Sequence, residues 1–255
     1  MTVNRVQIFY FSPTGGTEKV AKLIGAALKG ADAVYTDITV PNQDKFELGA
    51  EDLAVFCVPV YGGRVPSPAA ERMSRITGRD TPAALAAVFG NRAVDDALYE
   101  LRDMAKPRGF RTVAAGEFVA PHSLNTDFGA GRPDAADMKV IEQFGAGIME
   151  KLRKDELAEI NVPGNANYRQ YDGVPVKPSA SLRCVRCGAC AANCPAGAID
   201  FINPRLTDKN TCISCMRCVK ICPKGARHVS APIKAAVSMK LKGYCAGRKE
   251  DKLYL

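Results

Sequence analysis

The chain has 255 residues, enough for one large domain or two modest ones. Its apolar runs fall well short of the roughly 18 residues that a membrane-spanning helix needs, so we expect none. The formal charge of +8 is uneven, because residues 181–255 carry 14 Lys and Arg against 4 Asp and Glu. These charges are scattered along the chain and not grouped on one helix, which argues against a nucleic-acid surface.

Residues 1–153 alternate between strand and helix patterns. Apolar, strand-like runs are separated by segments whose apolar residues recur at helical spacing. This order predicts a domain with an open, five-stranded parallel α/β sheet, which binds ligands at the carboxyl ends of its strands. One helix is expected to open with Ser67 as N-cap and Pro68 at its first position. Strands are expected at 3–12, 32–38, 52–60, 82–90 and 110–120, and helices at 12–28 (with an opening loop), 67–76, 94–109 and 134–154.

The loop after the first expected strand, SPTGGT from Ser12 to Thr17, combines hydroxyl side chains and glycines at the start of a helix. Backbone N–H groups at a helix N-terminus bind phosphate, and hydroxyls add further donors. The loop lacks the lysine of a P-loop, and the chain has no G-x-G-x-x-G fingerprint. A single phosphate monoester therefore suits this loop better than a nucleoside triphosphate.

Two segments connect and follow the regular parts. Residues 154–182 contain three prolines and few apolar residues, which is typical of a linker. Residues 232–255 are expected to form a short helix and a basic tail. In that helix, Ile233, Val237 and Leu241 recur every four residues and predict an apolar face that packs on the preceding domain.

Eight of the ten cysteines lie in two copies of one motif, C-x2-C-x2-C-x3-C-P, offset by 28 residues. The first three cysteines of such a run can bind one [4Fe–4S] cluster, and in proteins with two clusters the fourth ligand comes from the other motif. The duplication predicts a small α+β, ferredoxin-like domain with two clusters at residues 183–231. The expected ligands are Cys184, Cys187, Cys190 and Cys222 for one cluster and Cys212, Cys215, Cys218 and Cys194 for the other.

Other chemistry for these cysteines is less favoured. Zinc also binds paired C-x2-C motifs, but two runs spaced 3, 3 and 4 apart, each followed by proline, favour iron–sulfur clusters. Disulfides need an oxidising compartment, and no signal peptide precedes the first strand pattern, so we expect free thiols and a cytoplasmic location. Outside the motifs, Cys57 is expected in the core and Cys245 is expected to be an ordinary thiol.

Three loops resemble those of flavodoxins. FSPTGGTEKVA (11–21) is similar to their FMN phosphate loop, and PVYGGRVP (59–66) to the loop that lies along the isoalloxazine ring. FGNRAVDDAL (89–98) is similar to the loop on the other side of the ring. Followed by the double cluster motif, these loops resemble a family of two-domain flavoproteins of anaerobes, called EFR-type, in which a flavodoxin-like domain is fused to a two-cluster ferredoxin.

The resemblance, which covers nearly the whole chain, implies roles for the loop residues. One departure is that many flavodoxins hold the ring between two aromatic side chains, whereas this chain has no Trp and has Val94 where an aromatic residue is expected. His122 follows the fifth expected strand and is a candidate for the same edge of the site. The phosphate is expected at Ser12, Thr14, Gly15, Gly16 and Thr17, the ring at Val60, Tyr61 (stacking) and Gly62, and the pyrimidine edge at Gly90, Asn91 and Arg92.

These features predict an iron–sulfur flavoprotein that transfers electrons between soluble redox partners through FMN and two [4Fe–4S] clusters. No side chain then needs to act as acid, base or nucleophile, because the cofactors carry the chemistry. A basic cluster domain favours an acidic soluble partner, such as a ferredoxin or a flavoenzyme. Two alternatives are a flavin-dependent reductase of a small molecule or quinone fed through the clusters, and a redox sensor or subunit of a larger complex.

Overall fold

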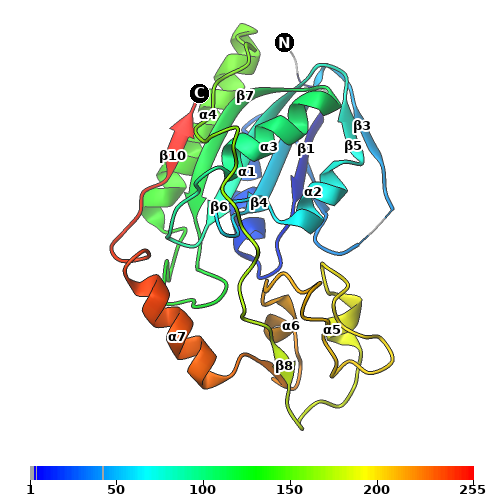
Figure 1. The fold of residues 1–255 in the computed structure, drawn as a ribbon. Coiled ribbons are helices and arrows are strands. Elements are labelled where there is room, and N and C mark those ends of the chain that lie inside the picture. The colour runs from blue at the N-terminus through cyan, green and yellow to red at the C-terminus, as the bar shows by residue number, and fades with distance from the viewer. Residues whose placement is uncertain (1–2, 4, 42) are drawn as a thin grey trace.

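The computed structural model describes residues 3, 5–41 and 43–255. Its centre is one sheet in the strand order β10-β7-β6-β4-β1-β2 (Figure 1). The five strands from β7 to β2 are parallel, as expected, and β10 adds an antiparallel sixth strand at the β7 edge. The bounds are β1 Arg5–Tyr10, β2 Ala33–Asp37, β4 Asp52–Pro59, β6 Thr81–Phe89, β7 Phe110–Val119 and β10 Lys252–Tyr254.

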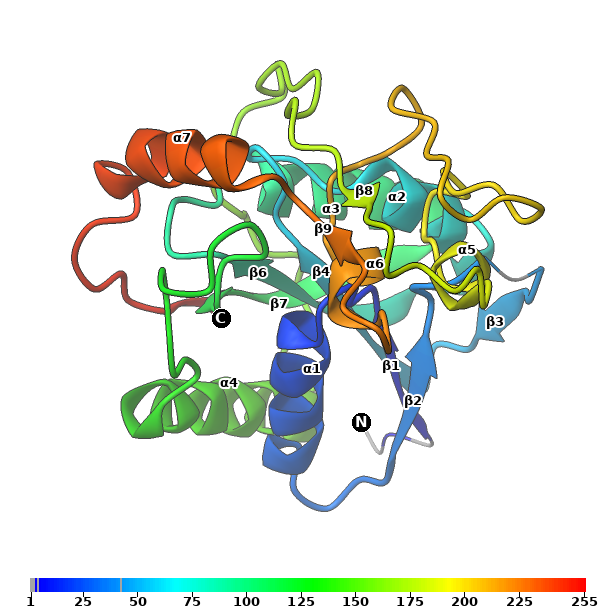
Figure 2. The ribbon, with the colours of Figure 1, turned by 90° about the horizontal axis from the view of Figure 1, so that it is seen from below.

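Helices cover both faces of this sheet, α1 and α4 on one side and α2 and α3 on the other (Figure 2). Because neighbouring strand residues point to opposite faces, Ile8 packs with the α1 and α4 side and Phe9 with the α2 and α3 side. All of β4 is buried, as its apolar sequence predicted. The bounds are α1 Gly16–Ala27, α2 Ser67–Met73, α3 Ala97–Ala105, the 3-10 turn η1 Lys106–Arg108, and α4 Ala135–Lys154.

The second helix differs from the expectation at both ends. It begins at Ser67 itself, so Pro66 is the N-cap and no side chain caps the helix. It ends at Met73; Ser74 and Arg75 form a turn, and Ile76, the last residue of the predicted helix, begins β5, Ile76–Gly78, which pairs in parallel with β3, Phe46–Leu48. This pairing is non-local, and the helical periodicity did not indicate it. Of the described helices, none is long and apolar enough to cross a bilayer.

The cysteine-rich region folds as a pseudo-symmetric unit beside the carboxyl ends of the sheet strands (Figure 1). Corresponding positions of the two motifs adopt the same backbone: Arg186 and Ser214 have φ of 56° and 58°, and Gly197 and Gly225 are also left-handed. The sequence duplication is therefore a duplication of structure. The elements are β8 Ser179–Ala180, α5 Ala189–Ala192, α6 Arg217–Lys220, β9 Arg227–His228 and α7 Ala231–Lys242.

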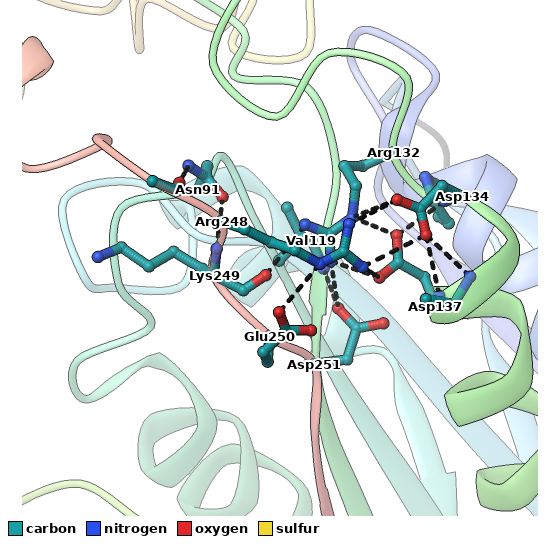
Figure 3. A network of polar contacts seen from close by, with 12 residues as sticks. Asn91, Val119, Arg132, Asp134, Asp137, Arg248, Lys249, Glu250 and Asp251 are labelled. Atoms are coloured by element: carbon teal, nitrogen blue, oxygen red, sulfur yellow. Dashed lines mark hydrogen bonds and ion pairs between the residues drawn. The ribbon is translucent and has the colours of Figure 1, made fainter.

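The last residues are not a free basic tail. After α7 the chain returns along the sheet edge and forms β10, so that the C-terminus lies beside β7 (Figure 1). The buried Arg132 guanidinium holds this return in place, because it binds both oxygens of Asp137 and donates to the Lys249 carbonyl at 3.0 Å (Figure 3). Arg248 adds ion pairs to Asp134 at 2.6 Å and to Asp137 at 3.0 Å.

Asp251 belongs to this network but is only partly hydrogen-bonded. Its Oδ1 accepts from the Val119 N–H at 2.8 Å, whereas its Oδ2 is buried without a partner among the described residues. Burial, opposed by that N–H and reinforced by Asp137, raises the pKa of Asp251 to about 6. Since this exceeds the unfolded value of about 3.9, the carboxyl contributes stability below about pH 4 and loses it as the pH rises through 6.

We therefore expect the free energy of unfolding of the Asp251→Asn variant to fall less between pH 4 and pH 7 than that of the wild type. Chemical unfolding followed by circular dichroism at several pH values measures this difference, with Asp127→Asn on an exposed loop as the matched control. If the unfolding midpoint of the Asp251→Asn variant followed the same pH profile as the wild type, the raised pKa would be contradicted.

Candidate functional site

A cavity of about 780 Å³ opens at the carboxyl ends of the strands. Its walls come from four parts of the chain: the strand-end loops of the sheet domain, the segment 169–176, Ser214 of the second cysteine motif, and helix α7. Nine of the eleven residues expected to bind FMN line it, and Gly15 and Asn91 do not: Ser12, Thr14, Gly16, Thr17, Val60, Tyr61, Gly62, Gly90 and Arg92.

The first loop presents donors to this cavity. Gly15 is the N-cap of α1 and needs its left-handed conformation, with φ of +92°. The Ser12 hydroxyl accepts from the Glu18 N–H at 2.9 Å and so fixes the first turn. In the described part of the chain, the Thr14 and Thr17 hydroxyls have no protein partner, although Thr17 is only 3% exposed. Together with the unsatisfied N–H groups that begin any helix, these hydroxyls suit an anion.

The second loop is a tight turn beside the cavity. Tyr61 and Arg64 exchange backbone hydrogen bonds of 3.0 and 3.1 Å, with Gly62 and Gly63 both at positive φ between them. Two positive φ values define a type I′ turn, which explains the glycine pair. Burial, and then the neighbouring Cys215 and Tyr171, raises the pKa of Tyr61, so its phenol stays neutral.

Tyr171 is an aromatic side chain that the sequence analysis did not assign to the site. It lines the cavity, and a Cβ added to Gly62 would collide with its ring. Val94, which stands where an aromatic residue was expected, is instead 4% exposed in the core of the sheet domain and does not line the cavity. The linker therefore contributes an aromatic group close to the turn that carries Tyr61.

The linker is anchored by one carboxylate of the third loop. Asp96 accepts hydrogen bonds from the Asn165 N–H at 2.9 Å, from the Asn165 amide at 3.1 Å and from the Arg169 N–H at 2.7 Å. Although burial opposes them, these donors hold the pKa of Asp96 below its usual range. Asp96 sits at the N-cap position of α3 but makes no cap bond, so its side chain serves the linker and positions Tyr171.

The other residues of the third loop divide between two tasks. Arg92 lines the cavity and pairs with Asp95, whereas the Asn91 amide donates to the carbonyls of Cys245 and Gly247 at 2.8 Å each. Asn91 thus holds the returning C-terminal segment and does not face the cavity. Cys245, expected to be an ordinary thiol, is 3% exposed at this contact, and Cys57 lies in the core as expected.

His122, which follows β7, lines the cavity. Burial, and then the charge of Arg92, lowers its pKa to about 4, so the imidazole is neutral near pH 7. Its Nδ1 accepts from the Leu124 N–H at 3.1 Å. The proton of the neutral ring is therefore on Nε2.

Helix α7 forms where a helix was expected, but its apolar face lines the cavity. Ile233, Val237 and Leu241 are all lining residues, and none of the residues of α7 is buried. A helix of 12 residues with no buried side chain has little packing of its own to hold it. Its apolar side instead forms a wall of the space in which a ligand of the cavity would sit.

The eight motif cysteines form two sets, each drawn from both motifs. Cys184, Cys187, Cys190 and Cys222 surround one small hollow, which we call the outer cysteine set. In the other set, burial raises the pKa of Cys215 to about 12 against a backbone hydrogen bond from Arg217, and the nearby Cys218, Cys194 and Cys212 raise it further. This inner cysteine set lies next to the large cavity, because Ser214, which directly precedes Cys215, lines that cavity together with Tyr61.

Matching amide donors approach the fourth cysteine of each motif. The Ala198 N–H donates to Cys194 Sγ at 3.3 Å, and the Ala226 N–H donates to Cys222 Sγ at 3.2 Å. A thiolate sulfur, the form that ligates metals, can accept such bonds. Among the described residues, no three His, Cys, Asp or Glu side chains are placed around a single metal ion.

Two arginines join the cysteine unit to the sheet domain. Arg217, which follows Cys215 of the inner set by two residues, donates to the carbonyls of Ser12 and Pro13 at 3.3 and 3.4 Å. Arg72, 4% exposed, donates to the Ile38 and Thr39 carbonyls and to that of Pro195, next to Cys194. The phosphate-loop candidate and the inner set are thus fixed relative to one another.

Comparisons with known proteins divide the chain in the same way. A flavodoxin model matches residues 8–130, and a 4Fe-4S dicluster domain model matches residues 183–226. No curated protein is significantly similar to the chain.

Solved structures that resemble the chain include flavodoxins. One from the domain Archaea has 14% identity over 58% of this chain and 99% of its own, with a TM-score of 0.45. The flavodoxin of Streptococcus pneumonia TIGR4 has 18% identity over 57% and 98%, with a TM-score of 0.42. A flavone reductase has 14% identity over 66% and 72%, with a TM-score of 0.46.

The residues present fit the cofactors of both domain types. FMN needs an anion site for its phosphate and flat, largely apolar walls for its ring, and the cavity offers hydroxyls at a helix N-terminus beside aromatic and aliphatic side chains. Four thiols around each of two centres are the donor set of a [4Fe–4S] cluster.

Proposed function

We propose that this chain relays electrons between soluble redox proteins. It is a fusion of a flavodoxin domain and a 4Fe-4S dicluster domain. It is thus an electron-transfer flavoprotein of the FMN and iron–sulfur type. We assign it one FMN in the 780 Å³ cavity and two [4Fe–4S] clusters, one on each cysteine set. When bound, the flavin exchanges one or two electrons and each cluster exchanges one, which lets one chain connect two-electron and one-electron partners.

The observation that carries this proposal is the contact between the two parts. The inner cysteine set adjoins the wall of the FMN cavity through Ser214 and Tyr61. Arg217 and Arg72 hold that arrangement by hydrogen bonds to the phosphate loop and to Pro195. A fixed, short separation between two redox sites is what an internal electron relay requires. Eight cysteines proposed as cluster ligands and two further thiols, Cys57 and Cys245, fit a reducing compartment, so we place the protein in the cytoplasm.

In the proposed site, Thr14 and Thr17 bind the phosphate with the first turn of α1, and Ser12 keeps that turn in place. Tyr61 and Tyr171 are the aromatic groups for the ring, and α7 excludes water with its apolar face. His122, neutral and fixed by Leu124, offers an Nε2–H donor to the cavity. Arg92 and Lys240 add positive charge to its walls.

An anaerobic redox titration of freshly purified protein, with iron and flavin quantified, tests this proposal. We expect about eight irons and one FMN per chain, with cluster signals in the electron paramagnetic resonance (EPR) spectrum of the reduced protein. Two bound zinc ions and no flavin would overturn it.

A second candidate function is reduction of a small apolar molecule or quinone at the flavin. The observation that favours it is the wall of α7, which is held by no buried residue of its own and is apolar toward the cavity. Steady turnover with an added quinone would support this second function. If the flavin does not react with quinones, the relay is the function that remains.

A further inference from the structure

Large apolar side chains are exposed around the outer cysteine set. They come from two segments, residues 182–185 at the start of the first motif and 201–206 after it, whose backbone lies in the cysteine-rich unit below the sheet (Figure 1). Large apolar groups gathered in solvent mark interaction surfaces. We call them the 182–206 patch: Leu182 91%, Val185 60%, Phe201 71%, Ile202 95% and Leu206 57% exposed.

The two segments of the patch are tied together at the outer set. The Arg205 guanidinium donates to the Cys184 carbonyl at 3.0 Å and to the Leu182 carbonyl at 3.5 Å. The Cys190 Sγ lies 3.9 Å from the Pro204 carbonyl. The patch is therefore one surface, and its loops contact two cysteines of the outer set.

Positive charge surrounds the patch. Arg183, Arg186 and Lys209 are exposed within or beside its two segments, and Lys224 is exposed next to Cys222. The exposed acids nearby are Asp200 and Asp208, and Asp208 is engaged with Thr211. A surface with an apolar centre and a basic rim is complementary to an acidic protein with an apolar contact area.

The two cysteine sets differ in access. Cys215 of the inner set is 8% exposed; its neighbour Ser214 lines the large cavity, and its neighbour Ile213 packs on the core of the sheet domain. Cys187 of the outer set is exposed to solvent. A protein partner can therefore approach the outer set closely, whereas the sheet domain covers the inner one.

From these contacts we infer that the 182–206 patch is the docking site for an acidic, soluble one-electron carrier of the ferredoxin class. This inference rests on the proposed relay and adds to it the surface at which a partner binds. The exposed Cys187 and Val185 belong to that surface, and the basic rim, which includes Arg186, orients the partner by attraction to its acidic face.

Binding of an oxidised acidic two-cluster ferredoxin, measured anaerobically by isothermal titration calorimetry at low salt, tests the inference without turnover. We expect the double variants Phe201→Ser with Ile202→Ser and Arg183→Glu with Lys209→Glu each to raise Kd by about tenfold or more, as for the centre and charged rim of an interface. The wild-type affinity should fall as salt rises. Lys29→Glu with Lys139→Glu, exposed lysines of the sheet domain, makes the same charge change elsewhere and should leave Kd unchanged.

Iron, flavin and the dithionite-reduced EPR spectrum of each variant are measured first. Variants that keep wild-type cofactors but lose binding support the docking site. Unchanged Kd in both patch variants, or no binding by the wild type, overturns the docking site while leaving the relay intact. A wild-type dimer in sedimentation that Phe201→Ser with Ile202→Ser dissociates would also overturn it, because the patch would then contact a second copy of this chain. Missing iron or flavin in the wild type would instead refute the proposed function.

Discussion

Cys222→Ala is expected to lose the same cluster as Cys187→Ala, although the two cysteines belong to different motifs. The reason is that Cys222 lies with Cys184, Cys187 and Cys190 around one hollow, while Cys194 of the first motif lies with the second. Each substitution removes one of four thiolates, so we expect a loss of up to about four irons per chain or conversion to a three-iron cluster.

Four single variants make this a matched comparison. Iron content and EPR spectra of the reduced proteins should group Cys222→Ala with Cys187→Ala, and Cys194→Ala with Cys215→Ala. Grouping by motif instead, with Cys222→Ala resembling Cys215→Ala, would show that the ligands are not exchanged between motifs. Cys57→Ala, in the core of the sheet domain, should keep both clusters.

Thr14→Ala combined with Thr17→Ala is expected to weaken FMN binding by about a hundredfold or more. Each hydroxyl would donate to a charged phosphate, and such a bond contributes about 1.5–3 kcal/mol, while a factor of ten in affinity corresponds to about 1.4 kcal/mol. Both side chains line the cavity without another partner among the described residues. Flavin fluorescence during titration of the flavin-free protein with FMN measures the affinity.

Two controls separate lost hydroxyls from lost packing. Thr14→Ser with Thr17→Ser keeps the donors and should retain most of the affinity, and Thr77→Ala on the exposed edge of β5 should change nothing. The loss of FMN affinity should depend on the phosphate group. Riboflavin, which lacks this phosphate, should therefore bind to the wild type and to the alanine variant with the same affinity. Unchanged FMN affinity in the alanine variant would remove the phosphate from this loop.

The sequence by itself determined those features whose information is local. Strand and helix periodicity predicted the five parallel strands, because a side-chain pattern of 2 or 3.6 residues is a property of neighbouring positions. The cysteine motifs and the SPTGGT loop were recognisable for the same reason, since one short segment holds most of the groups that face one ligand. The second β3–β5 sheet and strand β10 were missed because their pairing partners lie far away in the sequence.

Only the tertiary structure decided how the site is closed. Tyr171 reaches the cavity because Asp96, distant in sequence, binds the linker at Asn165 and Arg169. Helix α7 forms a wall because Asn91 and Arg132 hold the returning chain behind it. These hydrogen bonds join residues that are between 69 and 154 positions apart, and a single sequence records the donors and acceptors of such bonds but not which of them meet.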